Sequence, residues 1–305
     1  MHHIAWAILC ILLIIMTTSL WTSIQSLQRA NGDLRSQLAA AKMPIQRTCK
    51  VQGEWRAGET KRLSAATTTG DRHYLVHLPT NFTDSTYYPV LLFYPGKGAS
   101  AEAGEMAFGL DALPAIVIYP YPTTGTDGAN SWQGAPYSSG VDDVAFTNSI
   151  LDQVETDLCI DRTKVYAAGL SNGGGFASLL SCRLSDRIAA YAIVSGAVYY
   201  PSGECKPPRS VPLVTIHGDA DPIVPFNGSV TRKLPPIYTW TAMRAQMNQC
   251  QKLQVTYPNT ATTATTWSDC KDKAVVQSVN IRGGGHVWGQ VSNDYLWQFL
   301  SRFSL

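Results

Sequence analysis

The chain of 305 residues carries little charge and no excess of either sign. Charged residues make up 15% of it, the formal net charge is +2, and the lysines and arginines form no stripe. Proteins that bind nucleic acids normally present a concentrated basic surface, so this function is disfavoured. The hydrophobic content of 45% instead indicates a globular protein with ample core, and the length suits one large α/β domain or two modest ones.

No two cysteines are spaced as C-x-x-C, so the sequence predicts no metal site. Of seven cysteines, Cys10 lies in an apolar run near the N-terminus. The others form an even set that is typical of disulfides in an oxidising compartment. Spacing alone does not fix the pairing. The pairs that we expect are Cys159–Cys182, because both close helix-strand units, Cys250–Cys270, which bracket a Thr-rich stretch, and, as the remainder, Cys49–Cys205.

Residues 4–21 are uncharged and mostly apolar. At about 1.5 Å per residue this run extends about 27 Å, close to the thickness of a hydrocarbon core. No basic residue precedes it, which favours an uncleaved membrane anchor over residues 1–21 above a cleaved signal peptide and a secreted product. The basic residues of 22–47 argue against export of the domain C-terminal to them. The cysteines favour export, so we expect an anchored, extracytoplasmic domain.

Residues 22–47 form a predicted stalk or linker between the anchor and a domain over 48–305. Apolar residues recur there at steps of four and three, with Asn31 at a position that sets register in two-stranded coiled coils. This pattern indicates a weak dimer through the stalk. Asn31-Gly32 is also a turn signal, however, and favours a loose tether.

Strands and helices alternate through the rest of the chain. The predicted strands are 72–79, 88–94, 115–119, 164–169, 189–195, 211–217 and 274–282, and the predicted helices are 140–158, 172–184, 237–248 and 291–303. Such alternation predicts a mostly parallel sheet with helices on both faces. The Thr-rich stretch 256–266 is predicted to be a loop, and no internal repeat is present.

A serine stands at the turn between the predicted strand 164–169 and helix 172–184. The sequence there is Gly169-Leu-Ser-Asn-Gly173, in which glycines flank Ser171 on both sides. A serine in a strained strand-to-helix turn needs neighbours without a Cβ, so that strand and helix can approach closely. The pattern therefore predicts an exposed nucleophile at Ser171.

The partners that a nucleophilic serine needs come after two later strands. Such a serine requires a histidine base, and the base requires a carboxylate to orient it. Strand 211–217 is followed by Asp219 and Asp221, and strand 274–282 by His286 on a glycine-rich loop. Both acids remain candidates from their position, whereas His217 is expected to brace its own loop.

The chain from about residue 70 onward resembles the secreted feruloyl esterase and polyhydroxybutyrate depolymerase-like group of α/β-hydrolases. The matching motifs are Gly169-Leu-Ser-Asn-Gly-Gly174, His217-Gly-Asp-Ala-Asp221 with Val224-Pro225, and Gly283-Gly-Gly-His286-Val-Trp288. The resemblance implies an α/β-hydrolase fold and an acid at Asp221. One departure is Pro95, where the family usually has a histidine, so the bracing of the oxyanion loop must differ here.

The activity implied by this resemblance is hydrolysis of carboxylic esters, feruloyl- or acetyl-polysaccharide or polyhydroxyalkanoate, without a cofactor. We expect the backbone N–H groups of Asn172 and Lys97 to form the oxyanion hole. Trp132, Tyr137 and Trp288 are predicted to line the substrate site. The alternatives are an acyltransferase that modifies a wall sugar or a lipid, and an inactive binding module.

Overall fold

The computed structural model describes residues 51–199 and 205–305. The predicted anchor 1–21, the stalk 22–47 and Cys49 lie outside these residues, so the predictions about them stay predictions. Among the residues that are described, no helix has the length and apolar character needed to cross a membrane.

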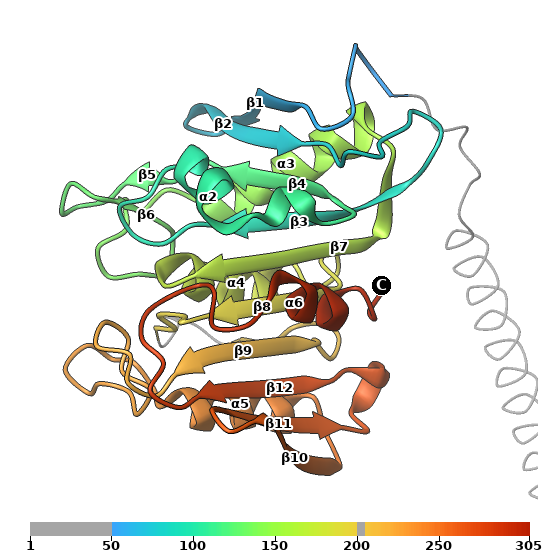
Figure 1. Cartoon of the computed structure of the whole chain (residues 1–305). Helices are drawn as coiled ribbons and strands as arrows, with labels where there is room; N and C mark the ends of the chain where they lie inside the picture. The colour runs from blue at the N-terminus through green and yellow to red at the C-terminus, as the bar shows by residue number, and fades with distance from the viewer. Residues whose placement is uncertain (1–50, 200–204) are drawn as a thin grey trace, which may run out of the picture. The chain divides into compact units, whose positions relative to one another are not determined.

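A single large sheet of ten strands organises the domain (Figure 1). Its order is β1-β2-β4-β3-β7-β8-β9-β12-β11-β10, and the six central strands from β4 to β12 are parallel. The central strands are β4 (Ile116–Pro120), β3 (Tyr88–Tyr94), β7 (Ile160–Leu170), β8 (Ala190–Val194), β9 (Leu213–Gly218) and β12 (Val276–Ile281). Antiparallel pairs flank them: β1 (Thr60–Thr67) with β2 (Gly70–His77), and β11 (Thr262–Ser268) with β10 (Lys252–Asn259). A separate small pair joins β5 (Thr123–Thr124) to β6 (Asn130–Ser131).

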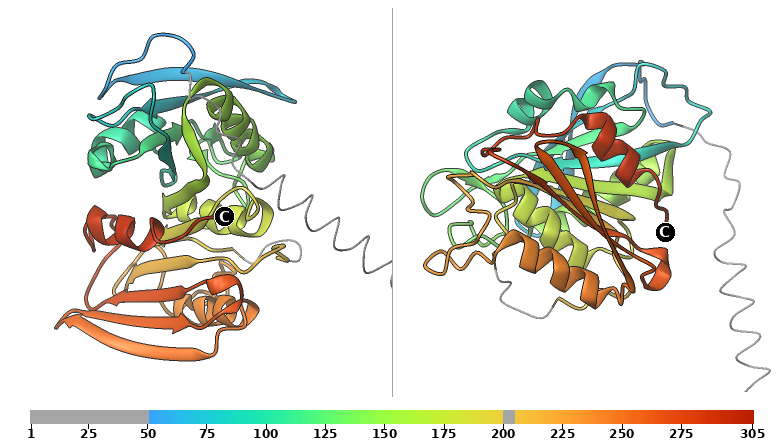
Figure 2. Two further views of the ribbon diagram at one scale, coloured as in Figure 1. Left: turned by 90° about the vertical axis from the view of Figure 1, so that its right-hand side faces the viewer. Right: turned by 60° about the horizontal axis from the view of Figure 1, so that its bottom comes forward.

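Helices cover both faces of this sheet (Figures 1 and 2). On one face lie α2 (Ala101–Phe108), the short 3-10 helix η1 (Leu110–Ala112) and α6 (Asn293–Leu300); on the other lie α3 (Asp143–Asp157), α4 (Asn172–Arg183) and α5 (Ile237–Met247). A further 3-10 turn, η2 (Lys271–Lys273), precedes β12.

Each face has its own apolar core, because alternate side chains of a strand point to opposite faces. Leu92 of β3 packs with Phe146 of α3 in one cluster, whereas its neighbour Phe93 packs with Leu296 of α6 in the other. All seven residues of β3 except Pro89 are buried. The prediction of a mostly parallel sheet with helices on both faces is confirmed.

The Thr-rich stretch 256–266 is not a loop, and this prediction was wrong. It forms most of the hairpin β10–β11, in which Val255 pairs with Thr265. Threonine is β-branched and suits strands, but the deciding contact is tertiary: β11 pairs along β12 from Thr262 to Trp267. The sequence pattern also contained no indication of β1 or α2.

Two disulfides join described cysteines. Cys250–Cys270 is confirmed, but Cys182 is bonded to Cys205, so the predicted pairs Cys159–Cys182 and Cys49–Cys205 were wrong. The reason is direction: Cys182 faces Arg244 of α5, whereas the Cys159 sulfur lies 3.5 Å from the Asp84 carbonyl oxygen on the β3 side. Cys159 is itself disulfide-bonded, to none of the other described cysteines.

Candidate active site

Ser171 occupies a strained turn between β7 and α4. Its φ of 56° and ψ of −120° are unusual for a residue with a side chain. The close approach needs glycine: a Cβ on Gly173 would lie 2.0 Å from the Tyr94 carbonyl oxygen, and one on Gly169 would lie 2.3 Å from the Gly173 oxygen. Although Ser171 is the N-cap residue of α4, its hydroxyl does not cap the helix. The hydroxyl therefore remains available for other chemistry, as expected of a nucleophile.

His286 and Asp221 meet beyond the carboxyl ends of β12 and β9. The Asp221 Oδ2 atom accepts a hydrogen bond from His286 Nδ1 at 2.8 Å. Its other oxygen, Oδ1, accepts from the backbone N–H groups of Ile223 and Val224, both at 2.8 Å. In this hydrogen bond the proton is on His286 Nδ1. The other ring nitrogen, Nε2, therefore has a free lone pair, which is the form needed in a general base.

The environment of Asp221 keeps its carboxylate ionised. Burial by itself would raise the pKa of Asp221, which is 4% exposed, but hydrogen bonds from His217, the Val224 amide, His286 and the Ile223 amide outweigh burial and hold that pKa well below its usual range. An ionised Asp221 places a negative charge beside the His286 ring.

The neighbouring candidates Asp219 and His217 have other partners. Asp219 is exposed, and its Oδ1 accepts a hydrogen bond from the Gly283 amide at 2.7 Å, which fastens the base of the His286 loop. His217 Nε2 lies 2.8 Å from the Val224 carbonyl oxygen and 3.3 Å from Asp221 Oδ2. A carbonyl can only accept, so His217 Nε2 carries a proton and braces the loop of Asp221, as predicted for this histidine.

The loop after β3 lies directly against Ser171. A Cβ on Gly96 would come within 3.3 Å of the Ser171 Cβ. The backbone N–H of Lys97 is thus in the part of the chain from which a second oxyanion donor is expected, beside that of Asn172 at the start of α4. The Lys97 side chain turns to Asp127 and lies over the Tyr137 ring, 4.3 Å from its centre.

Trp132 supplies the loop bracing that Pro95 does not. The indole N–H of Trp132 donates to the Pro95 carbonyl at 2.9 Å, and its backbone N–H donates to Asn172 Oδ1 at 2.8 Å. Next to it, the Gly98 N–H donates to the Asn130 carbonyl at 2.8 Å. The segment around β6 therefore ties the loop after β3 to the start of α4, and it fixes both expected oxyanion donors.

Two of the three aromatic residues predicted to line the substrate site are buried. Trp132 is 0% exposed and stacks on Phe176, and Trp288 is 6% exposed and packs edge-to-face against Phe93. These two predictions were wrong, because the rings fill the core beneath the site and support its loops. Tyr137 is half-buried and lies in edge-to-face contact with Tyr199, so it stays a candidate for substrate contact.

Comparison with known proteins finds one matching family model and several similar sequences. Residues 101–234 match the family described as "Esterase PHB depolymerase". Feruloyl esterase B of Piromyces equi is 31% identical over 257 residues, which are 77% of this chain and 46% of the relative. Probable feruloyl esterase C of Aspergillus flavus is 28% identical over 244 residues, 75% of this chain and 83% of the relative. The chain therefore spans about half of the first relative and most of the second.

Solved structures give the fold. Acetyl xylan esterase from Aspergillus awamori superposes with a TM-score of 0.57 at 16% identity, covering 80% of this chain and 99% of the other. A ferulic acid esterase from Anaeromyces mucronatus in complex with ferulic acid gives 0.51 at 14% identity, covering 85% and 95%. This chain has the α/β-hydrolase fold. The family model it matches and these relatives describe polyhydroxybutyrate depolymerase-like and feruloyl esterases, which confirms the resemblance of its motifs to that group.

A cavity of about 390 Å³ opens beside α4. Asn172 and Gly175 of α4 contribute to its wall, with Tyr199 at one side. Apolar side chains from α4, α5 and the segment after β8 supply much of the remaining lining, among them Leu179, Val198, Trp240, Met243 and Met247. A volume of this size is in the range of small-molecule sites.

Gln290 is a supporting residue of the candidate site that sequence reasoning missed. Its side-chain Nε2 donates to the carbonyl oxygens of Gly285 at 2.9 Å and Val287 at 3.2 Å, the two residues that flank His286. The same nitrogen lies 3.2 Å from the Ser195 hydroxyl oxygen, just past β8. Gln290 therefore fixes the backbone on both sides of His286 to the central sheet. No motif marks such a residue, because its role depends on a loop folding back on itself.

We expect Gln290→Ala to lower kcat for ester hydrolysis roughly 10- to 100-fold while KM stays nearly unchanged, because small displacements of a catalytic group have effects of this size. Gln290→Glu is the matched variant, since a carboxylate has the same shape but cannot donate to the two carbonyls. It should not restore kcat. Steady-state kinetics on p-nitrophenyl acetate measure both constants. A kcat equal to that of the wild type in Gln290→Ala would show that Gln290 does not position His286.

Proposed function

We propose that this α/β-hydrolase is a serine carboxylic ester hydrolase that uses Ser171, His286 and Asp221 as a catalytic triad. The observation that carries the proposal is the 2.8 Å hydrogen bond from His286 Nδ1 to a buried Asp221, on the same sheet edge as a strained serine turn. Within the described residues the Ser171 hydroxyl makes no hydrogen bond. Its approach to His286 Nε2 is therefore assigned to the complex with substrate, where catalytic contacts commonly tighten.

The reaction proceeds through an acyl-enzyme. The Ser171 oxygen attacks the ester carbonyl carbon, and His286 Nε2 takes the serine proton. The N–H groups of Asn172 and Lys97 then donate to the oxygen that becomes negative. When the tetrahedral intermediate collapses, His286 gives the proton to the departing alcohol, and Asp221 holds the imidazole throughout. Water repeats the sequence on the acyl-enzyme and releases the acid without a cofactor.

The proposed substrates are esters of feruloyl or acetyl groups on polysaccharides, or polyhydroxyalkanoate-type polymers. The names of the relatives support the first two, since they are feruloyl esterases and an acetyl xylan esterase. The cavity beside α4 supports an apolar acyl group, because it reaches Asn172, the neighbour of Ser171, and more of its lining is apolar than polar; Ser171 and His286 themselves do not line it. Tyr137 is proposed to contact the substrate, since it lies between Lys97 of the oxyanion loop and Tyr199 of the cavity wall.

An extracytoplasmic location is proposed for the domain. Two disulfides between described cysteines and the disulfide-bonded Cys159 support it, because such bonds persist in oxidising compartments. Attachment through residues 1–21, or secretion after their cleavage, and weak dimerisation through residues 22–47 remain predictions from the sequence.

A fluorophosphonate probe and two substrates test the proposal together. We expect the probe to label Ser171 at one equivalent per chain, and both methyl ferulate and p-nitrophenyl acetate to be hydrolysed. An added alcohol acceptor should leave the rate of p-nitrophenol release almost unchanged. Release that depends strongly on the acceptor would instead identify an acyltransferase. Absence of both labelling and turnover would leave an inactive binding module.

A further inference from the structure

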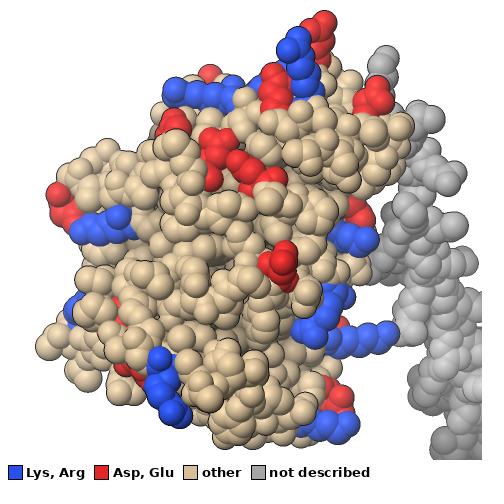
Figure 3. All heavy atoms as spheres, viewed as in Figure 1, with Lys and Arg blue, Asp and Glu red and all other residues tan. Residues whose placement is uncertain are grey.

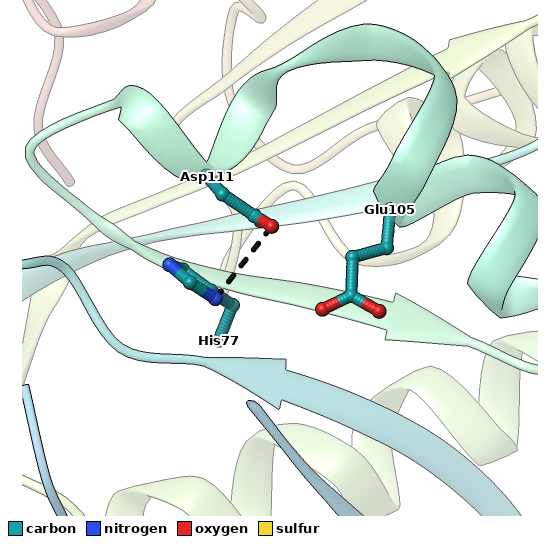
Figure 4. A group of neighbouring side chains, drawn as sticks. All are labelled: His77, Glu105 and Asp111. Atoms are coloured by element: carbon teal, nitrogen blue, oxygen red, sulfur yellow. Dashed lines mark ion pairs between the residues drawn. The ribbon is translucent and has the colours of Figure 1, made fainter. Parts of the chain in front are cut away.

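A histidine and two carboxylates converge on the face of the sheet covered by α2 (Figure 4). His77 stands at the end of β2, Glu105 on α2 and Asp111 on η1. One ligand atom from each of the three lies within 4.8 Å of the others, and His77 Nδ1 is 3.6 Å from Asp111 Oδ2. Three separate elements thus bring together atoms of the kinds that bind divalent transition metals.

A fourth possible ligand atom adjoins this group. The Thr60 hydroxyl, at the start of β1, donates to Glu105 Oε1 at 2.5 Å and lies 2.8 Å from His77 Nδ1. The carboxylate oxygen of Asp111 that does not face His77, Oδ1, accepts a hydrogen bond from the Tyr119 hydroxyl at 2.6 Å. Bonds of this outer kind orient metal-binding carboxylates.

The group lacks a cation to balance its charge. No described lysine or arginine forms an ion pair with Glu105 or Asp111, and the one charged or chargeable partner of Asp111 in that part of the chain is His77. Acidic side chains gather over α2 on this face of the molecule (Figure 3). Glu105 and Asp111 are half-buried, so an ion can reach them from solvent.

His77 itself is an unusual buried group. It is 8% exposed, and its Nε2 has no hydrogen-bond partner among the described residues. The ring nitrogen that faces the two carboxylates is Nδ1, whose neighbours are the Thr60 hydroxyl at 2.8 Å and Asp111 Oδ2 at 3.6 Å (Figure 4). Nothing in the triad mechanism uses His77, so the catalytic function does not account for it.

We propose that His77, Glu105 and Asp111 bind one divalent transition-metal ion of the zinc type, with Thr60 or water completing the coordination. Zinc bonds to nitrogen and oxygen of about 2.0–2.2 Å place neighbouring ligands of a tetrahedral site about 3.4 Å apart. The 3.6 Å between His77 Nδ1 and Asp111 Oδ2 is close to this. An imidazole ligand favours zinc over calcium or magnesium, which prefer oxygen alone.

The ion would act on stability, because the site lies at the far edge of the sheet from the triad. His77 pairs with Val117 near the amino end of β4, whereas Ser171 and His286 come after the carboxyl ends of β7 and β12. A metal bound there joins β1, β2 and the α2–η1 segment to one another. No sequence pattern indicated this site, because its ligands come from distant positions and include no cysteine.

The test uses the full chain freed of metal with a chelator and titrated with zinc chloride in a calorimeter, with calcium and magnesium chloride as comparisons. We expect one zinc per chain and a melting temperature that rises with zinc, since a ligand bound to the folded state stabilises it. Glu105→Gln and Asp111→Asn should each weaken zinc binding about tenfold or more. Glu102→Gln is the matched control: it removes an acid from the same helix, one that is hydrogen-bonded to Tyr121, and should bind zinc as the wild type does.

Three outcomes would overturn the proposal. They are the absence of zinc binding by the wild-type chain, full binding by both Glu105→Gln and Asp111→Asn, and loss of binding on replacing His2 and His3 instead. If either Glu105→Gln or Asp111→Asn folds poorly, zinc binding by the other variant, with its melting curve as a check on folding, still tests the proposal. Ester hydrolysis is expected to be the same with and without zinc, so the result is independent of the proposed esterase activity.

Discussion

Ser171→Ala and His286→Ala are each expected to lower kcat for p-nitrophenyl acetate by roughly 10⁴- to 10⁶-fold. The double variant should be scarcely worse than either single one. The reason is that the two side chains act in the same step: without the nucleophile there is no proton for His286 to take, and without the base the Ser171 hydroxyl is a poor nucleophile. Steady-state rates, with the melting temperature as a check on folding, measure this directly.

His73→Ala serves as the control for this experiment. His73 is an exposed histidine of β2 that contacts Tyr121 and is no part of the proposed triad. Its variant should keep wild-type activity. If the losses in Ser171→Ala and His286→Ala were to multiply in the double variant, the two residues would be acting independently and the triad assignment would fail.

Asp221→Asn is expected to lower kcat at neutral pH by about 10⁴-fold. The new amide would turn two hydrogens toward a site where His286 Nδ1 and His217 Nε2 both donate to Asp221 Oδ2. Donors would face donors, and His286 would have to adopt the tautomer with its proton on Nε2, which cannot act as a base. The matched variant is Asp219→Asn, whose amide oxygen can still accept from Gly283; it should lose less than about tenfold.

Equal losses in the two variants, or a larger loss in Asp219→Asn, would contradict the assignment. The pH dependence of stability gives a second test of the role of Asp221. The pKa of Asp221 is lowered on folding, so the ionised side chain contributes fully to the free energy of unfolding above the ordinary pKa of 3.8. That contribution disappears as the pH falls through the lower pKa of the folded state. The wild type should therefore exceed Asp221→Asn in stability near neutral pH, and the difference should shrink in strong acid.

The sequence by itself determined the local features of this α/β-hydrolase fold. The turn at Ser171 could be predicted because its geometry depends on adjacent glycines, which no distant contact can replace. Parallel strands could be predicted from apolar runs, and their carboxyl ends meet at one edge of the sheet. For this reason Ser171, Asp221 and His286 could be named as candidates before any contact was known.

Tertiary structure decided whatever depends on direction or on a distant partner. Asp219 and Asp221 lie two residues apart after β9, and only the path of the loop turns Asp221 toward His286. Trp132 and Trp288 lie in loop-like stretches of the sequence, where side chains are usually exposed, but the fold buries both rings. Cysteine pairing likewise depended on the direction in which each side chain points, and not on the order of the helix-strand units.

The same reason explains the supports of the site and the cluster on α2. Trp132 braces the loop at Pro95 across 37 positions of sequence, and Thr60 reaches Glu105 across 45. The stretch 256–266 became strand because β12 offered it an edge to pair with. Contacts of this kind depend on how the whole chain folds, since local sequence carries no information about which distant backbone will lie beside it.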